Sequence, residues 1–231
     1  VKEPLLVCGK DKALKCGEEF KVFNYGFYRK TEKEIKIGYL YPRNSYDLMK
    51  AVVNGIYTFA KLGKYHGEKD LYTMAGLLDL DVKAMVREEY ELGDITDYKR
   101  AANKLQKIEG IDLVIALVPD GMEEDGPYNP FKTIWAKANI PSQMISMKTA
   151  KLFAEEAKEG NKAKNNSRYY LHNIILGILG KTGGIPWVVK DMPGNVDCFV
   201  GLDVATIAKG IHYPACSVVF DKYGRCLLYT S

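Results

Sequence analysis

The stretch that decides the fold class is "IDLVIALVP", residues 111–119, a continuous apolar run bounded by Gly110 and by Pro119-Asp120-Gly121. An unbroken apolar run of this length is typical of a strand buried on both faces, as in a parallel sheet covered by helices. Strand-like and helical patterns alternate on both sides of this run. The sequence therefore predicts an α/β fold with a Rossmann-like parallel sheet.

The remaining elements follow from hydrophobic periodicity and from capping residues. Strands are expected at 34–42, at 142–146 and in "PWVV", 186–189. Helices are expected at about 45–63, 96–108, 130–138, 149–158 and 168–180, with one or two short helices within 69–92. From Val196 onward the pattern changes to strands with a Tyr223-Gly224 turn between them, which predicts a β-hairpin.

Bulk properties narrow the class of protein only slightly. The 231 residues carry a net charge of +4, which neither demands nor excludes a nucleic-acid partner. Five cysteines without a Cys-x-x-Cys pair favour reduced thiols in a cytoplasmic protein over a disulfide frame or a zinc site. The sequence has no apolar run of membrane-spanning length and no secretory signal, so no membrane partner is expected. The start at Val1 and the stop within "GRCLLYTS" lead us to expect a piece of a longer protein.

Gly180-Lys181-Thr182 raises the question of a phosphate-binding P-loop. The P-loop pattern G-x-x-x-x-G-K-[ST] requires a glycine at position 175, where this chain has Ile175. The P-loop also follows a strand and opens a helix, whereas here a predicted helix comes first and a strand follows. We interpret Gly183 and Gly184 as the exit of that helix, with Lys181 in its last turn.

The segment "GKTGGIPWVV", 180–189, resembles the Lys-x-Gly-Gly-Ile-Pro-Trp signature that ends the last helix of the MID domain in prokaryotic Argonaute proteins. In that family four residues hold the 5′ end of a guide strand. The resemblance places them at Tyr128 and Lys132 in "YNPFK", at Gln143 in "PSQMIS" and at Lys181.

Two further stretches carry the resemblance over most of the chain. "EPLLVCGKDKALKCGEEFKVFNYGFY", 3–28, resembles the segment that precedes MID, and "FVGLDVAT", 199–206, resembles the first strand of the RNase H-like PIWI nuclease domain. Asp203 stands where the family keeps its first catalytic acid. The resemblance implies a linker over 1–34, a MID domain over 35–192 and the first hairpin strands of PIWI over 193–231.

The residue types suit a terminal phosphate and an unpaired base. Lys132 and Lys181 can neutralise a phosphomonoester, Gln143 can donate an amide N–H, and Tyr128 can stack on the base. With Asn129 and Pro130 as N-cap and first helical residue, Lys132 would lie in the first turn, where a cation opposes the helix dipole unless an anion is near.

Other candidate contacts are less specific. Lys148, Asn173 and Arg168 are candidates for further guide contacts, and a solvated helix face is the alternative. Eukaryotic relatives have a further lysine one turn before the final one, where this chain has Gly177. That difference leaves open whether a 5′-phosphate is strictly required.

The resemblance also implies partners and a cofactor. The partners would be a short single-stranded guide, DNA or RNA, and a complementary target, bound by a monomer. Mg²⁺ or Mn²⁺ would lie at the guide 5′-phosphate and in the PIWI site of the parent protein. Because Asp203 alone cannot hold two Mg²⁺ ions, we do not expect this chain by itself to cleave nucleic acid, and the parent is either a guide-dependent endonuclease or a binding protein. The alternatives outside the family are a Rossmann-like module that binds a nucleotide or sugar, and a structural interaction domain.

Overall fold

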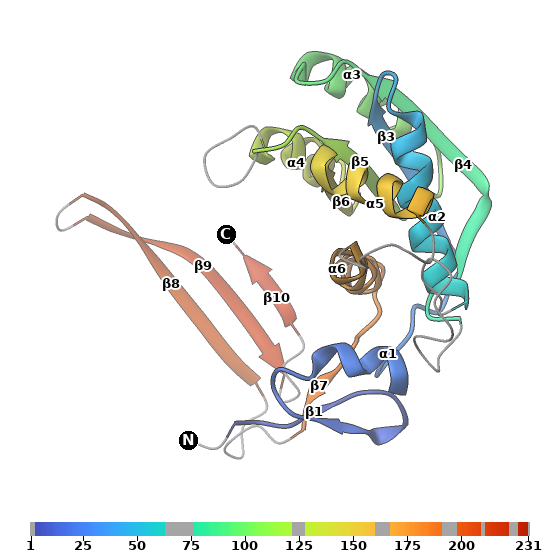
Figure 1. The fold of residues 1–231 in the computed structure, drawn as a ribbon. Coiled ribbons are helices and arrows are strands. Elements are labelled where there is room, and N and C mark those ends of the chain that lie inside the picture. The colour runs from blue at the N-terminus through green and yellow to red at the C-terminus, as the bar shows by residue number, and fades with distance from the viewer. Residues whose placement is uncertain are drawn as a thin grey trace. The chain divides into compact units, whose positions relative to one another are not determined.

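The structure is a computed structural model that describes residues 3–62, 76–121, 128–159, 167–190, 198–208, 211–221 and 226–230 (Figure 1). The chain divides into two compact units, of which the larger is Lys30–Ile185 and the smaller combines Val1–Arg29 with Pro186–Ser231. The predicted limits of the functional domains, at 1–34, 35–192 and 193–231, stay a prediction.

The larger unit is built on a four-stranded parallel sheet in the order β4-β3-β5-β6. Its strands are β3 (Ile35–Pro42), β4 (Leu80–Tyr90), β5 (Leu113–Val118) and β6 (Ser142–Ser146). Every residue of β5 is buried, as the apolar run at 111–119 predicted. The α/β fold with a parallel sheet is confirmed.

The helices of this unit form two groups. Helices α2 (Tyr46–Leu62), α5 (Met147–Glu159) and α6 (Ser167–Lys181) contact one another, and α3 (Ile95–Gln106) contacts α4 (Tyr128–Lys137). The connection from β3 to β4, through α2, runs toward one edge of the sheet, and the connections from β4 to β5 and from β5 to β6, through α3 and α4, run toward the other edge. Because crossovers between parallel strands are right-handed, α2 lies on one face of the sheet and α3 and α4 lie on the other. All five predicted helices outside 69–92 are confirmed to within two residues at each end.

Strand β4 corrects the prediction of short helices within 69–92. Leu80–Tyr90 is an extended strand that pairs in parallel with β3. Its second half alternates, with Val86, Glu88 and Tyr90 more buried than Arg87 and Glu89. Pairing with β3, which is distant in sequence, overrode a weak helical pattern. The part of the predicted segment before Gly76 lies outside the described residues.

The smaller unit contains two antiparallel sheets. Strand β7 (Val188–Val189) is the predicted "PWVV" strand, but it pairs with β1 (Leu6–Val7), which also pairs with β2 (Ala13–Leu14). A short helix α1 (Val22–Tyr25) and two 3₁₀ turns (Gly9–Asp11 and Glu19–Lys21) complete the leading segment. Strands β8 (Cys198–Ala208), β9 (Ile211–Asp221) and β10 (Cys226–Thr230) form the second sheet. This sheet confirms the strands predicted after Val196; the Tyr223-Gly224 turn lies outside the described residues.

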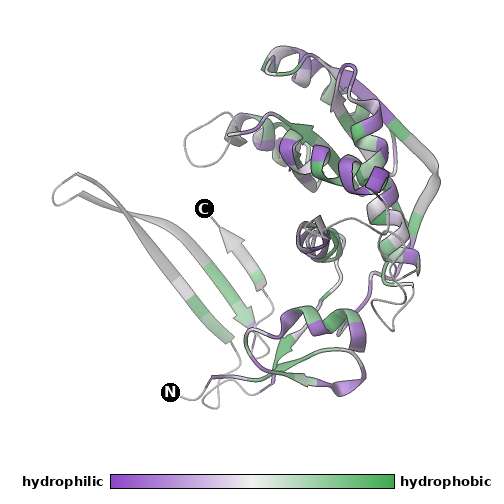
Figure 2. Ribbon diagram, viewed as in Figure 1, coloured by the Kyte–Doolittle hydropathy of each residue, from purple (hydrophilic) through white to green (hydrophobic). Residues whose placement is uncertain are grey.

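Strand β5 is more hydrophobic than the outward-facing residues of the helices around it. Figure 2 shows a hydrophobic β5 and many hydrophilic residues along helices α3 and α5. Within the part of the chain that the structure describes, no helix has both the length and the apolar character of a membrane span.

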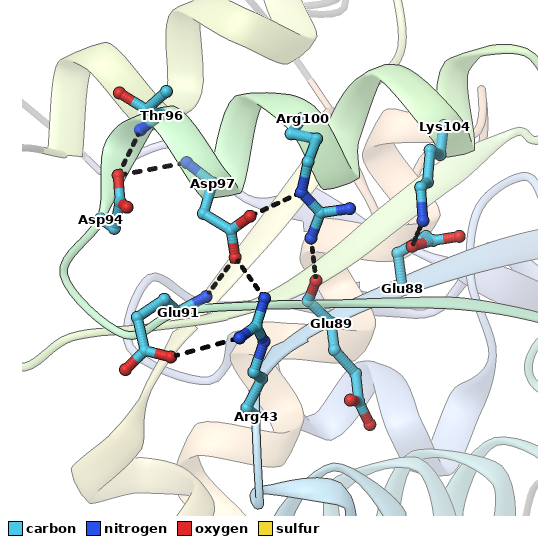
Figure 3. A network of polar contacts seen from close by, with 9 residues as sticks. All are labelled: Arg43, Glu88, Glu89, Glu91, Asp94, Thr96, Asp97, Arg100 and Lys104. Carbon is cyan, nitrogen blue, oxygen red and sulfur yellow. Dashed lines mark hydrogen bonds and ion pairs between the residues drawn. The ribbon is translucent and has the colours of Figure 1, made fainter.

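A polar network fixes the start of α3 against the carboxyl ends of β3 and β4 (Figure 3). The Asp94 carboxylate caps the helix by accepting from the backbone N–H groups of Thr96 (2.8 Å) and Asp97 (3.1 Å). The Asp97 carboxylate in turn accepts from Arg100 Nε (2.6 Å) and from Arg43 Nη2 (3.4 Å). Because Asp94 accounts for two of the N–H groups at the helix start, α3 begins one residue before the predicted position.

Aromatic rings form the core between α3, α4 and the sheet. The fully buried Trp135 of α4 donates its indole N–H to Tyr98 Oη of α3 at 2.7 Å. The rings of Tyr98 and Phe131 lie 4.3 Å apart, and Tyr90 Oη donates to the Leu117 carbonyl at 2.7 Å. These contacts fix the orientation of α4, and with it the position of Lys132.

Replacing Tyr98 with Phe removes the acceptor of the buried Trp135 N–H. A buried donor without a partner costs about 1–3 kcal/mol. We expect the free energy of unfolding to fall by that amount in urea titrations followed by circular dichroism. Tyr169→Phe is the control, because Tyr169 is 57% exposed. A Tyr98→Phe chain as stable as the wild type would show that this hydrogen bond does not stabilise the core.

We predict that the larger unit loses stability at low pH because of His172. It is buried in α6 beside Phe59, and burial, followed by the positive charge of Arg168, lowers the pKa of His172 to about 4. Between pH 6.5 and pH 4 the unfolded chain therefore binds a proton that the folded chain does not. We expect stability to fall as the pH drops through this range, by an amount of the order of 3 kcal/mol.

The matched variant for this effect is His172→Leu, which has no titrating group at this position. Its free energy of unfolding is expected to depend less on pH between 6.5 and 4, whereas above pH 6.5 the two dependences run parallel. Parallel curves over the whole range would show that His172 does not cause the acid sensitivity.

Candidate functional site

Three residues predicted from the sequence meet at the start of strand β6. Lys132 of α4 donates its ammonium protons to the Ser142 carbonyl and, at 2.9 Å, to Ser142 Oγ. Lys181 of α6 donates to Gln143 Oε1. Two lysines from different helices are thus held on two consecutive residues of one strand.

The position of β6 in the sheet explains how helices from different layers reach one place. Consecutive side chains of a strand point to opposite faces. Ser142 is opposite Val114, which belongs to the core under α3 and α4, and Gln143 is opposite Ile115 on the other face. Because β6 is the last strand in the described sheet order, Lys132 and Lys181 approach its edge from the two sides.

The end of α6 places Lys181. Gly183 adopts a positive φ of 88°, its N–H bonds to the Gly180 carbonyl, and the Gly184 N–H bonds to the Leu179 carbonyl at 2.8 Å. This is the Schellman arrangement that ends a helix, with Lys181 as the last helical residue. The interpretation of Gly183 and Gly184 as a helix exit is confirmed, and the P-loop is excluded by topology as well as by spacing.

The opposite end of α6 is anchored by a buried carboxylate. Glu156 of α5 accepts from the Ser167 backbone N–H at 3.1 Å and from the Ser167 hydroxyl. A carboxylate at a helix N-terminus satisfies orphan N–H groups and interacts favourably with the helix dipole. The start of α6 is therefore tied to α5, and the turn at Gly183 and Gly184 makes Lys181 the last residue of the helix.

Burial, and for Lys181 also the neighbouring Lys132 charge, lowers the affinity of the two ammonium groups for protons. Lys181 is exposed over its side chain as a whole, yet burial of its ammonium group, followed by the positive charge of Lys132, lowers the pKa of Lys181 to about 8. Burial also lowers the pKa of Lys132. The partners that the structure describes for both lysines are neutral oxygens. The site therefore concentrates positive charge that no described carboxylate balances.

Helix α4 begins earlier than the sequence indicated. It starts at Tyr128, two residues before the predicted Pro130, so Lys132 is its fifth residue and does not lie in the first turn. The expected conflict between Lys132 and the helix dipole is correspondingly smaller, because the effect is confined to the first turn. The Tyr128 side chain lies outside the described residues, so its stacking role stays a prediction.

The further candidate contacts lie away from this cluster. Arg168 and Asn173 precede Lys181 on α6 by about 20 Å and 12 Å at the rise of a helix, and the Arg168 guanidinium stacks over Tyr169. Lys148 is the second residue of α5, and its backbone N–H donates to Asp120 Oδ1 at 2.7 Å. Lys148 also lines a separate cavity of about 320 Å³ with Lys151 and other residues of α5 and α6. Guide contacts by these three residues stay a prediction.

Ser142 is the participant that sequence reasoning missed. Its neighbour Gln143 was singled out, and strand alternation already implied that the two side chains point to opposite faces. The sequence did not show that Lys132 would lie on the face of the sheet to which Ser142 points, because that depends on how α4 packs.

A model of the Piwi domain family matches residues 113–230, just over half of the chain. The chain belongs to the Argonaute family. It is 44% identical to the Clostridium butyricum Argonaute, whose structure is bound to a guide DNA with a 5′ deoxycytidine and to a 19-mer target DNA. That match covers 97% of this chain and 29% of the other, with a TM-score of 0.80.

Two more distant Argonautes also resemble this chain, one in sequence and the other in fold. The Argonaute of Aquifex aeolicus is 31% identical over 134 residues, which are 54% of this chain and 17% of that protein. The Marinitoga piezophila Argonaute, solved in complex with a 5′-OH guide RNA, is 14% identical and shares the fold with a TM-score of 0.61 over 100% of this chain and 33% of its own. This chain thus spans about a third or less of the length of these Argonautes.

The residues of the cluster do not fit the divalent ion that the resemblance implies. Lys132 and Lys181 are cationic, and the side-chain oxygen of Gln143 accepts from Lys181, so this set does not fit a divalent cation, which prefers several oxygen ligands. Among the described residues, no group of three or more His, Cys, Asp and Glu side chains could hold a metal ion.

The predicted catalytic acid lies in the smaller unit. Asp203 is on β8 with its backbone opposite Cys216 of β9, and the register shifts between Asp203 and Val204. One cause of such a shift is a β-bulge, a feature that is frequent next to active sites. The Asp203 side chain lies outside the described residues, and its catalytic and metal-binding roles stay predictions.

The coupling between the two lysines predicts a measurable change. Replacing Lys132 with Met removes a positive charge, so we expect the pKa of Lys181 to rise from about 8 but to stay below its usual value, since burial remains. NMR titration of the lysine side chains measures this directly. Lys148→Met is the control, because Lys148 is not among the causes of the lowered pKa. An unchanged pKa in Lys132→Met would show that the two ammonium groups do not interact.

Proposed function

We propose that this chain binds the 5′-phosphorylated end of a short guide DNA or RNA, as the guide-anchoring part of an Argonaute that recognises complementary targets. The observation that carries the proposal is the pair of ammonium groups at the start of β6, whose described partners are neutral. A phosphomonoester with a charge of about −1.5 to −2 at neutral pH matches that pair in charge.

Each group of the cluster has a role in this proposal. Lys132 and Lys181 donate charge-assisted hydrogen bonds to the phosphate through the ammonium protons that Ser142 and Gln143 do not accept. The Gln143 amide nitrogen donates to the Met144 carbonyl at 3.4 Å and has a second N–H that it can donate to the phosphate or its ester oxygen. Tyr128, at the start of α4, offers its ring to the first base, worth about 1–3 kcal/mol if it stacks.

The comparisons support the class of ligand more than its details. The Clostridium butyricum Argonaute, at 44% identity, is bound to guide and target DNA, which favours DNA as the first guide to test. We extend the proposal to the domains as well, with MID over 35–192 and the start of an RNase H-like PIWI domain over 193–231. The divalent ion at the phosphate and the cytoplasmic location stay predictions.

The proposal is tested by titrating fluorescent single-stranded oligonucleotides, DNA and RNA, with either a 5′-phosphate or a 5′-hydroxyl, and recording anisotropy. We expect the wild type to bind the 5′-phosphate forms at least tenfold more tightly, and Lys132→Ala with Lys181→Ala to abolish that ratio, because two charge-assisted contacts are lost. Salt must be held fixed, since counterion release changes all affinities.

The matched control is Lys99→Ala with Lys107→Ala, which also removes two positive charges, but from exposed positions on α3 and just after it. It should lower all affinities slightly and leave the 5′-phosphate ratio unchanged. Equal ratios in the two double variants would contradict the proposal. A free mononucleotide that binds as tightly as the oligonucleotide would favour the small-molecule module, and binding of none of these ligands would favour a structural domain.

A further inference from the structure

Gly177 lies on α6 one turn before Lys181, directly against the polar cluster. A Cβ placed on Gly177 would come within 2.7 Å of Gln143 Oε1 and 3.6 Å of Lys181 Nζ. Real Cβ atoms essentially never come within 3.0 Å of a non-bonded heavy atom. Gln143 Oε1, in the position where it accepts from Lys181, therefore occupies the space that a side chain at position 177 would need.

Gly180 lies on the same helix and provides the contrast. A Cβ at Gly180 would have nothing within 4 Å. Both glycines lie inside α6, where glycine lowers helix stability relative to alanine. Of these two glycines, Gly177 is the one whose missing side chain makes room for the contact between Gln143 and Lys181.

We propose that Gly177 is a positioning residue, which sets the preference of the site for a 5′-phosphate over a 5′-hydroxyl by leaving room for Gln143 to hold Lys181 beside Lys132. This inference rests on the proposed function. Gly177 itself touches no ligand, and it acts through the Gln143 amide.

The reason lies in the freedom of the Lys181 side chain. Lys181 is the last residue of α6 and its side chain reaches solvent, so without an acceptor the ammonium group samples many rotamers. Gln143 Oε1 is the acceptor that the structure describes for it. A Cβ at 177 displaces the end of the flexible Gln143 side chain, not backbone, so the chain still folds while the ammonium group is released into solvent.

The central variant is Gly177→Ala, with Gly180→Ala as its matched control. We expect the Tm of both variants to equal or exceed that of the wild type, because both replace a helical glycine with alanine. The affinity ratio of 5′-phosphate to 5′-hydroxyl oligonucleotides should fall at least threefold in Gly177→Ala and stay unchanged in Gly180→Ala. A gain in stability coupled to a loss of discrimination distinguishes positioning from general damage.

Two further readouts test the route through Gln143. In a Gln143→Ala background, Gly177→Ala should cause no additional loss of the ratio, as expected for residues that act through one contact. NMR titration should show the pKa of Lys181 rising from about 8 in both Gly177→Ala and Gln143→Ala, because the ammonium group moves away from Lys132 and into solvent. Gly180→Ala should leave that pKa unchanged.

The outcomes separate this inference from the proposed function. If the wild type shows no 5′-phosphate preference, or if the Lys132 and Lys181 variants leave it intact, the proposed function fails. If that preference holds but Gly177→Ala matches Gly180→Ala, only the role of Gly177 is overturned. A Tm of Gly177→Ala below the wild-type value, or a loss of ratio that persists in the Gln143→Ala background, would also overturn it.

Discussion

Strand β5 is buried on both faces, and the architecture of the larger unit depends on that constraint. Its backbone groups pair with β3 and β6, and its side chains require an apolar cover on each side of the sheet. The helices accordingly form two layers, with α4 in one and α6 in the other. Without both layers, the apolar side chains of β5 would face water.

The candidate site exists because these two layers come close at one edge strand. Strand β6 presents Ser142 to one face and Gln143 to the other, so a lysine from each layer can reach the same edge. Bringing two ammonium groups together in partly buried surroundings is unfavourable, as the lowered pKa of Lys181 indicates. An anion that carries nearly two charges would relieve this repulsion, which connects the packing of the sheet to the proposed ligand.

Local rules predicted the elements whose boundaries depend on nearby residues. The exit of α6 was predicted from Gly183 and Gly184, since its hydrogen bonds join residues within a few positions of one another. The Asp94 cap of α3 is equally local, but it was not predicted, and the start of α3 was expected one residue later. Strand β4 was missed because its pairing partner β3 is some 45 residues earlier in the chain. The β7 segment was correctly predicted as a strand, but its partner β1 lies at the opposite end of the sequence.

The sequence by itself therefore determined the fold class, most helices, and the placement of Lys132, Gln143 and Lys181 on two helices and a strand. The physical reason is that periodicity and capping act over one or two helical turns. Only the tertiary structure decided that Lys132 rests on Ser142, that Lys181 rests on Gln143, and that Gly177 leaves room for the second contact. Those contacts join residues that packing, and not neighbouring sequence, brings within hydrogen-bond distance.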